Sequence, residues 1–253
     1  MSFSIALAGK GGTGKTSLAC LIIRYLKNKK MVPILAVDAD PNANLGESLG
    51  LKVEQTVGSM IAAFQNEKIN ITPGLTKDVY LEYKLNSILV EGNGFDLLTM
   101  GRGEGPECYC VPNHLLKKFT DSLAQNYAYI VMDNEAGMEH LSRKTTENVD
   151  VLLLISDHSV KGVRTLARIR ELVTELKLVV KRQMVVINFV PGQLAPAVAD
   201  ELARLEIQPA VLIPEDDLVS EADLEFRSLL DLPDTSRAVG AVSKLMAEVL
   251  PKN

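Results

Sequence analysis

Gly9-Lys10-Gly11-Gly12-Thr13-Gly14-Lys15-Thr16 is the stretch that says most about this chain. It matches the phosphate-loop pattern G-x-x-x-x-G-K-S/T. The apolar run at residues 4–8 before it is typical of a buried strand, and residues 17–27 after it carry apolar side chains at helical spacing. A strand, a glycine-rich turn and a helix in this order aim backbone N–H groups and the helix dipole at one point, which suits a chain of phosphates.

The side chains of this loop predict a nucleotide site with a magnesium ion. We expect Lys15 to reach the β- and γ-phosphates of ATP and the Thr16 hydroxyl to ligate Mg²⁺. The glycines let the backbone approach the ligand closely, because no Cβ stands in the way. The expected contacts of the loop with ATP or ADP are Gly11, Gly12, Thr13, Gly14, Lys15, Thr16 and Ser17.

A second lysine, Lys10, follows the first glycine, although a phosphate loop does not need it. One interpretation is a solvated loop lysine. The other is a cation that serves the nucleotide of a facing subunit, as an arginine finger does in trans. The second interpretation predicts a homodimer in which Lys10 and Lys15 are both catalytic.

Carboxylates follow two further predicted strands, at 33–37 and 129–132. The first strand ends in Asp38 and Asp40, and the second ends in Asp133. The carboxyl ends of parallel strands form the edge where such sheets bind ligands, although an acidic turn would give the same aspartate-rich sequence. An Asp at the end of an apolar strand typically binds Mg²⁺ through a water molecule.

Cys108 and Cys110 lie one residue apart in a loop rich in glycine and proline. Such a pair can share one soft metal ion, although it can also simply pack beneath the loop. A tetrahedral ion wants four ligands. Cys20 is expected in the core, and His114 could add an imidazole, but the simplest shell takes the same cysteine pair from a second chain. Nickel, zinc or an iron–sulfur cluster would each fit four thiolates.

The charge, the hydropathy and the number of cysteines indicate which classes of protein this chain can belong to. The 253 residues have a net charge of −5, with 47% hydrophobic and 23% charged residues, which is ordinary for a globular protein. Because the chain is acidic and has no apolar run of about 18–20 residues, we expect neither nucleic acid nor a membrane as partner. Three cysteines argue against a disulfide framework, so we expect a cytoplasmic protein.

Helical and strand patterns alternate along the chain, which predicts an α/β fold with a doubly wound, mostly parallel sheet and helices on both faces. We expect one domain over 1–253. Residues 45–94 are interpreted as a surface insertion with two short helices. The remaining predicted strands are 95–101, 150–155, 183–187 and 211–213, and the remaining predicted helices are 113–124, 160–176, 196–205 and 236–249.

The loop with its extra lysine resembles the deviant Walker A motif of the MinD/ParA/nitrogenase iron protein class of P-loop ATPases. The resemblance implies a dimer in which Lys10 crosses the interface. It also implies that Asp38 belongs to the magnesium shell and that Asp40 orients or activates the attacking water. Asp133 and Gly137 resemble switch II, with Gly137 presenting its N–H to the γ-phosphate.

The same resemblance extends to the adenine site and to the cysteine loop. In this class, an Asn and a Pro that match Asn188 and Pro214 frame adenine. The Cys-x-Cys of Cys108 and Cys110 resembles the nickel-insertion ATPases of carbon monoxide dehydrogenase maturation and their acetyl-CoA synthase counterpart. This implies an ATPase dimer that carries Ni²⁺ or Zn²⁺ between two cysteine loops, with one of those enzymes as client.

Two other functions stay open at this point. One is an iron–sulfur carrier or reductase similar to the nitrogenase iron protein, although two cysteines from one C-x-C fit a single ion better than a cubane. The other is a positioning or partitioning ATPase of the MinD/ParA type, although the chain lacks the basic face or amphipathic tail that such proteins use.

Overall fold

The computed structural model describes residues 2–66, 83–102, 121–134 and 148–251. Within these ranges, eight strands form one sheet in the order β3-β4-β2-β5-β1-β6-β7-β8. Neighbouring strands run parallel except β3 and β4. The strands are β1 (Phe3–Gly9), β2 (Ile34–Asp38), β3 (Val90–Glu91), β4 (Phe95–Thr99), β5 (Tyr129–Asp133), β6 (Asn148–Ser156), β7 (Val179–Val190) and β8 (Pro209–Pro214).

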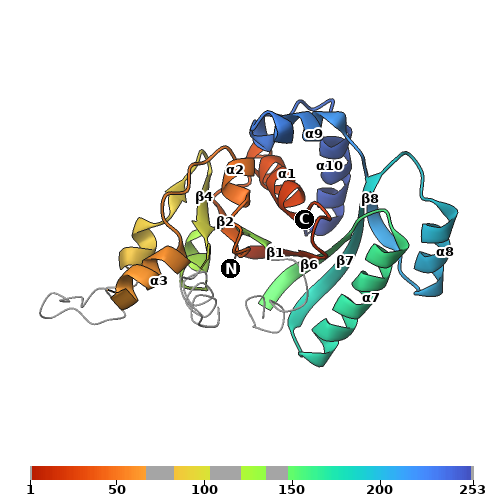
Figure 1. Cartoon of the computed structure of the whole chain (residues 1–253), viewed down its shortest axis with the longest axis horizontal. Coiled ribbons are helices and arrows are strands. Elements are labelled where there is room, and N and C mark those ends of the chain that lie inside the picture. Colours follow the sequence, from red (N-terminus) through yellow and green to blue (C-terminus); the bar gives the residue numbers. More distant parts are fainter. Residues whose placement is uncertain (1, 67–82, 103–120, 135–147, 252–253) are drawn as a thin grey trace, which may run out of the picture.

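Helices cover both faces of this sheet, so the predicted doubly wound, mostly parallel α/β fold is confirmed (Figure 1). The longer helices are α1 (Lys15–Asn28), α3 (Val57–Asn66), α7 (Val160–Glu175), α8 (Pro196–Arg204), α9 (Asp217–Leu224) and α10 (Arg237–Val249). The shorter ones are α2 (Leu45–Ser48), η1 (Ala124–Asn126) and η2 (Leu229–Asp231).

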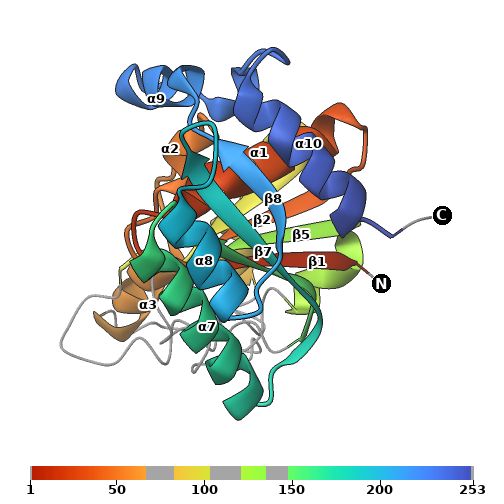
Figure 2. The same ribbon diagram turned by 90° about the vertical axis from the view of Figure 1, so that its right-hand side faces the viewer.

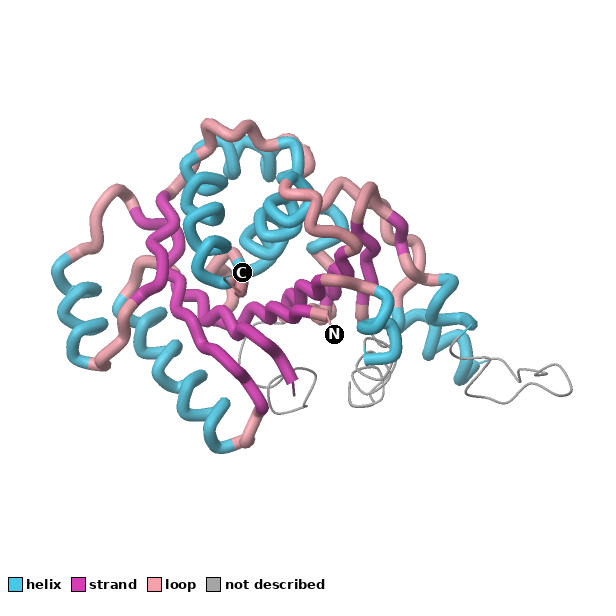
Figure 3. The backbone as a smooth tube through the Cα atoms, turned by 180° about the vertical axis from the view of Figure 1, so that it is seen from behind, coloured by secondary structure: helices cyan, strands magenta, loops and turns pink. Residues whose placement is uncertain are grey.

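Two hydrophobic clusters lie on opposite faces because successive strand residues point to opposite sides. In β1, Ile5 and Leu7 join the cluster that contains α1 and α10, whereas Ala6 and Ala8 join the cluster that contains α3, α7 and α8. The side view in Figure 2 and the view from behind in Figure 3 show these two helix layers with the strands between them.

Helix α1 fixes the position of the phosphate loop. Leu18, Ile22 and Leu26 recur at intervals of four residues and are at most 2% exposed. Burial of a side chain of this size contributes about 1.5–3 kcal/mol. Since α1 packs against both the sheet and α10, the loop that precedes it is attached to a largely buried helix.

Several elements differ from the predictions. The described parts of 45–94 are not only a surface insertion, because Leu45, Val57 and Leu85 are buried in the two cores. β3 was not predicted, and the two larger differences are in β7 and α9. β7 is longer than the predicted 183–187 because its first residues, although exposed and partly charged, pair in parallel with β6. Helix α9 was not predicted. It begins after Asp216, whose carboxylate accepts the Leu218 N–H at 3.1 Å. Of the predicted helix at 113–124, residues 113–120 lie outside the described ranges. None of the helices in the described part of the chain has the length and apolar character that a membrane crossing requires.

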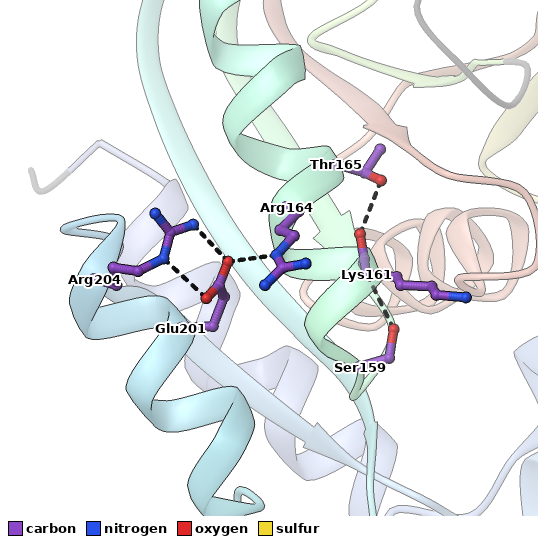
Figure 4. A network of polar contacts seen from close by, with 7 residues as sticks. Ser159, Lys161, Arg164, Thr165, Glu201 and Arg204 are labelled. Atoms are coloured by element: carbon purple, nitrogen blue, oxygen red, sulfur yellow. Dashed lines mark hydrogen bonds and ion pairs between the residues drawn. The ribbon is translucent and has the colours of Figure 1, made fainter.

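An ion-pair network joins α7 to α8 (Figure 4). Glu201 accepts hydrogen bonds from Arg204 at 2.6 Å and from Arg164 at 2.7 Å. The Glu201 side chain is 8% exposed, whereas both guanidinium side chains are more than half exposed. Hydrogen bonds from Arg204 and then Arg164 lower the pKa of Glu201 to about 2.

Glu201→Gln is expected to lower the free energy of unfolding at pH 7. A carboxylate with a depressed pKa stabilises the folded chain above its usual pKa of 4.5, and this contribution is lost as the pH falls toward about 2. Urea unfolding at pH 7 and pH 3 should therefore show a difference from wild type that shrinks at the lower pH. Glu171→Gln, at an exposed glutamate of α7, is the control. Equal losses in both variants would contradict the network's role.

Candidate functional site

The phosphate loop runs from the end of β1 to the start of α1. Gly12 and Gly14 both have φ of 78°, a region that favours glycine. The Thr13 hydroxyl donates to the Lys10 carbonyl at 2.8 Å, which closes the loop on itself. Gly14 is the N-cap of α1 and no side chain caps that end. A helix N-terminus that no side chain caps favours an anion such as phosphate.

Lys15 lies buried inside this loop. Its ammonium donates to the carbonyl oxygens of Gly9 at 3.3 Å and Lys10 at 3.2 Å. It also lines the cavity in front of the loop. The Lys10 side chain, in contrast, is exposed. One lysine thus belongs to the loop's interior, and the other is accessible to a second molecule.

Asp38 and Asp133 end two adjacent parallel strands and lie in register. Burial, followed by the nearby Asp133 charge, raises the pKa of Asp38 to about 7, although N–H groups of Leu45 and Asp40 oppose the shift. Burial likewise raises the pKa of Asp133 to about 6, opposed by the Thr16 hydroxyl and the Lys15 charge. Two buried acids with raised pKa values form a site that a cation would stabilise.

The residues present fit a magnesium ion. The Thr16 hydroxyl donates a hydrogen bond to the Asp133 carboxylate, so the two expected ligands are adjacent. Among the described residues, the buried Asp133 Oδ1 has no hydrogen-bond partner. Oxygen ligands of this kind, one hydroxyl and one carboxylate beside a phosphate site, are those that Mg²⁺ prefers.

Asp38 has a further contact that the sequence did not predict. Its Oδ2 accepts the Leu45 N–H at 2.9 Å, and its Oδ1 accepts the Asp40 N–H at 3.1 Å. Asp40 in turn accepts two hydrogen bonds from Asn42, through the backbone N–H at 2.8 Å and the side-chain amide at 3.0 Å. Asp38 therefore shapes the loop that carries Asp40 to the cavity.

A cavity of about 790 Å³ lies in front of the phosphate loop. It brings together residues predicted from two separate motifs, the loop itself and Asp40. It is also lined by Phe189 and by residues of α9 and its C-terminal extension, none of which the sequence analysis selected. The lining residues are Gly11, Gly12, Gly14, Lys15, Thr16, Ser17, Asp40, Asn42, Asn44, Glu47, Ser48, Phe189, Ala222, Asp223, Leu224, Phe226, Arg227 and Leu229.

A second cavity of about 220 Å³ adjoins the first at Ser17 and Phe189. Asn188 and Pro214, which the sequence analysis assigned to adenine, both line it. Asn188 is buried, and its Nδ2 donates to the Thr13 carbonyl at 2.9 Å. The end of β7 is thereby bound directly to the phosphate loop. Asp216, the N-cap of α9, also lines this cavity.

Two features near the site, the start of α9 and the buried Asn134, were not predicted from the sequence. Asp216-Asp217 before an apolar residue is a helix-start signal and could have revealed α9. Asn134 follows Asp133 and is buried, and its Nδ2 donates to the Leu7 carbonyl at 2.9 Å, which joins β5 to β1 beside the loop. Nothing in its local sequence distinguishes this role.

Gly14→Ala is expected to destabilise the protein more than Gly12→Ala. Both glycines have the same left-handed φ, so both substitutions incur backbone strain of about 1–2 kcal/mol. A Cβ at Gly14 would lie 2.4 Å from Asn188 Nδ2 and 2.8 Å from Phe189 Cζ, whereas a Cβ at Gly12 meets nothing within 4 Å. The overpacking adds about 1–3 kcal/mol at Gly14 alone. Urea unfolding of both variants measures the difference, and equal losses would show that backbone strain alone matters.

Three predicted site residues, Gly137, Cys108 and Cys110, lie outside the described residues. Within the described ranges, no group of three or more His, Cys, Asp or Glu side chains is placed to hold a metal ion. Cys20 is buried, as predicted for a core residue. Its thiol contacts the Ser48 carbonyl at 3.3 Å, and burial raises its pKa far above the usual range.

The chain is similar to known proteins over most of its length. The family model described as the CobQ/CobB/MinD/ParA nucleotide binding domain matches residues 4–229. An uncharacterized ATP-binding protein of Methanocaldococcus jannaschii is 40% identical over 250 residues, which cover 98% of both chains. The carbon monoxide dehydrogenase accessory protein CooC of Rhodospirillum rubrum is 29% identical over 184 residues, which cover 68% of this chain and 69% of that protein.

A solved structure shares the fold. The septum site-determining protein MinD of Pyrococcus horikoshii, determined in complex with Mg-ADP, superposes with a TM-score of 0.71. The superposition covers 98% of this chain and 96% of that one, at 20% sequence identity. The architecture is therefore that of the MinD/ParA P-loop proteins.

Proposed function

Because the chain belongs to the CobQ/CobB/MinD/ParA nucleotide-binding family, we propose that it is an Mg²⁺-dependent ATPase and that residues 1–253 form one catalytic domain. One observation carries the proposal. Lys15, Thr16 and Asp40, from two separate segments, line a single cavity in front of the phosphate loop, and Thr16 is bonded to Asp133. This is the arrangement that phosphoryl transfer to water needs, since catalysis there consists mainly of positioning and charge stabilisation.

Each group around the cavity has a role in this proposal. The loop N–H groups and Lys15 bind the phosphates, and Thr16 and Asp133 hold Mg²⁺, with Asp38 behind them. When bound, the ion would neutralise charge on the β- and γ-phosphate oxygens. Asp40 orients the water that attacks the γ-phosphorus as the bond to the bridging oxygen breaks. The N–H of Gly137 binds the γ-phosphate in the same scheme.

The adenine end of ATP belongs in the second cavity. Asn188 and Pro214 line it, and it opens beside the phosphate loop at Ser17. Asn188 also donates a hydrogen bond to the phosphate loop, so the residues that would bind the base and those that would bind the phosphates are directly connected.

The proposed working unit is a homodimer in which Lys10 acts on the partner's nucleotide. The exposed side chain of Lys10, beside a loop whose own Lys15 is buried, supports this arrangement. ATP can shift the dimer equilibrium only by its differential affinity for the two states. A lysine that reaches the nucleotide only in the closed dimer would supply that difference.

The proposed biological role is nickel insertion into carbon monoxide dehydrogenase or acetyl-CoA synthase. The 29% identity with the accessory protein CooC and the Cys108-Tyr109-Cys110 sequence support it. Ni²⁺ or Zn²⁺ would be cargo, shared by the Cys108 and Cys110 thiolates of two chains. Cargo binding and ATP binding would then be linked through the dimer, so each should change the affinity for the other.

The experiment is light scattering combined with a count of bound nickel, without ligand, with ATP and Mg²⁺, and with Ni²⁺. We expect Ni²⁺ to produce a dimer that holds about one ion per two chains, and we expect the Cys108→Ser, Cys110→Ser double variant to lose it. Cys20→Ser, at a buried cysteine, is the matched control and should keep the ion.

The same samples distinguish failure of the proposed ATPase activity from failure of the proposed nickel-insertion role. If the protein hydrolyses ATP but binds no nickel, the ATPase proposal stands and the proposal of a metal cargo is excluded. That result would favour a positioning ATPase of the MinD/ParA type. A brown protein that holds iron and sulfide would favour an iron–sulfur carrier. A monomer that neither binds nor hydrolyses ATP would refute the whole proposal.

A further inference from the structure

Phe189 occupies a position between the two cavities. It lines both the larger cavity at the phosphate loop and the smaller one at the end of β8, and among the lining residues it shares this position only with Ser17. A nucleotide with its phosphates on the loop and its base in the smaller cavity must therefore run past Ser17 and Phe189.

The backbone holds the Phe189 ring at this passage. Phe189 has φ of 57°, a left-handed conformation that costs energy in a residue with a side chain. The pairing of β7 with β8 shifts register between Ile187 and Val190, so the strand is irregular at this residue. Asn188, its neighbour, is fastened to the Thr13 carbonyl. Backbone strain of this kind is kept where the surrounding structure determines it, commonly at ligand sites.

The ring itself lies against the loop. A Cβ on Gly14 would be 2.8 Å from Phe189 Cζ and 3.4 Å from Cε2. Yet 37% of Phe189 is exposed, unlike the fully buried residues of either core, so part of this residue is accessible to a ligand. An exposed aromatic residue beside a nucleotide path can stack on any base, because every base has a π-face.

We propose that the Phe189 ring stacks on the base of the bound nucleotide and so contributes affinity for the nucleoside part of ATP. This inference rests on the proposed function, because it places ATP across both cavities. The opposing interpretation is a structural one, in which the ring only packs on Gly14 and keeps the phosphate loop in shape. The two differ in which part of the ligand depends on Phe189.

The test compares ATP with inorganic tripolyphosphate, both with Mg²⁺, by calorimetric titration of the full chain. Phe189→Ala is expected to weaken ATP about tenfold, within the range that base–aromatic stacking supplies, and to change tripolyphosphate by less than about twofold. Phe189→Tyr keeps the ring and should bind both ligands like wild type. Leu212→Ala is the matched control, because Leu212 is 38% exposed, lies on the adjacent β8 and lines neither cavity.

Several results would overturn the inference. Equal weakening of ATP and tripolyphosphate in Phe189→Ala would assign the ring to loop structure, and unchanged ATP affinity would exclude stacking. Loss of ATP affinity in Phe189→Tyr, with the fold intact by thermal melting, would also contradict it. Failure of the proposed function is recognised separately, because wild type itself would then not bind ATP.

Discussion

Lys10→Ala is expected to lower the rate of ATP hydrolysis about 10³-fold, while ATP affinity changes little, because a cation supplied in trans is worth about 10³–10⁵ in rate. Lys10 is exposed in the single chain, and its side chain is not among the lining residues of the larger cavity. Its charge would act on the phosphates only after a second chain closes over the site. The measurement is phosphate release, together with ATP titration of the same variant.

A mixing experiment gives this prediction its sharpest form. Lys15→Ala removes the lysine inside the loop. It should also abolish hydrolysis, since in the proposed function Lys15 binds the nucleotide of its own chain. A dimer of one Lys10→Ala chain and one Lys15→Ala chain contains one complete site. Equal mixing of the two inactive variants should restore about a quarter of the wild-type rate, because about half of randomly formed dimers are mixed and each has one of its two sites complete.

Two results would contradict a role in trans. If Lys10→Ala hydrolyses ATP like wild type, the residue is a solvated loop lysine. If the variant is inactive but mixing restores nothing, Lys10 acts within its own chain. Lys29→Ala, at an exposed lysine near the end of α1, controls for the loss of one positive charge.

Asp133→Asn is expected to move activity and stability in opposite directions. Hydrolysis should fall about 10²-fold or more, the usual effect of removing one group that stabilises the transition-state charge. The nucleotide-free protein, however, should become more stable above pH 7 by about 1–3 kcal/mol, because a buried charge beside Asp38 is removed. Functional sites often retain such destabilising groups.

The sign of the pH dependence follows from the raised pKa. In the unfolded chain Asp133 titrates near 3.8, whereas in the folded chain its pKa is about 6. An acid with a raised pKa is held protonated by the folded state, so its destabilising effect is absent below about pH 4 and complete above about pH 7. Wild type should therefore lose stability over this range, and Asp133→Asn should lose less, because the pKa of Asp38 also falls when the neighbouring charge is absent.

Urea unfolding at pH 5 and pH 8 without nucleotide or Mg²⁺ measures this effect. A second test is the addition of Mg²⁺ with ADP, which should stabilise wild type more than the variant. The prediction fails if Asp133→Asn is less stable than wild type at pH 8, since Asp133 would then be a net structural partner of Lys15 and Thr16.

The carboxyl-end residues show why much of the site was predictable. Asp38 and Asp133 lie nearly a hundred residues apart in the chain, yet each ends an apolar strand. In a parallel sheet such ends meet at one edge, so the sequence could place both beside Thr16 without knowing the strand order. The pattern does not show, and the structure does, that the two carboxylate oxygens of Asp38 accept hydrogen bonds from the N–H groups of Asp40 and Leu45.

The missed features have a different origin. Phe189 enters the site because β7 and β8 lose register beside it, and an irregularity of that kind depends on how two strands pack. The segment Asp217–Leu224 is only eight residues long, so its helical period is weak. β7 begins at Val179, before the predicted strand at 183–187, because its first residues pair with β6.

Local sequence was therefore sufficient for the phosphate loop, the flanking strand and helix, the alternating α/β order and the acids at the strand ends, since these depend on residues that are close in the chain. Tertiary structure was needed for the second cavity, for the Phe189 ring over Gly14 and for the hydrogen bond between Asn188 and Thr13, which joins residues 175 positions apart. The physical reason is that periodicity and turn chemistry act within one element, whereas such contacts exist only after both faces of the sheet have been packed.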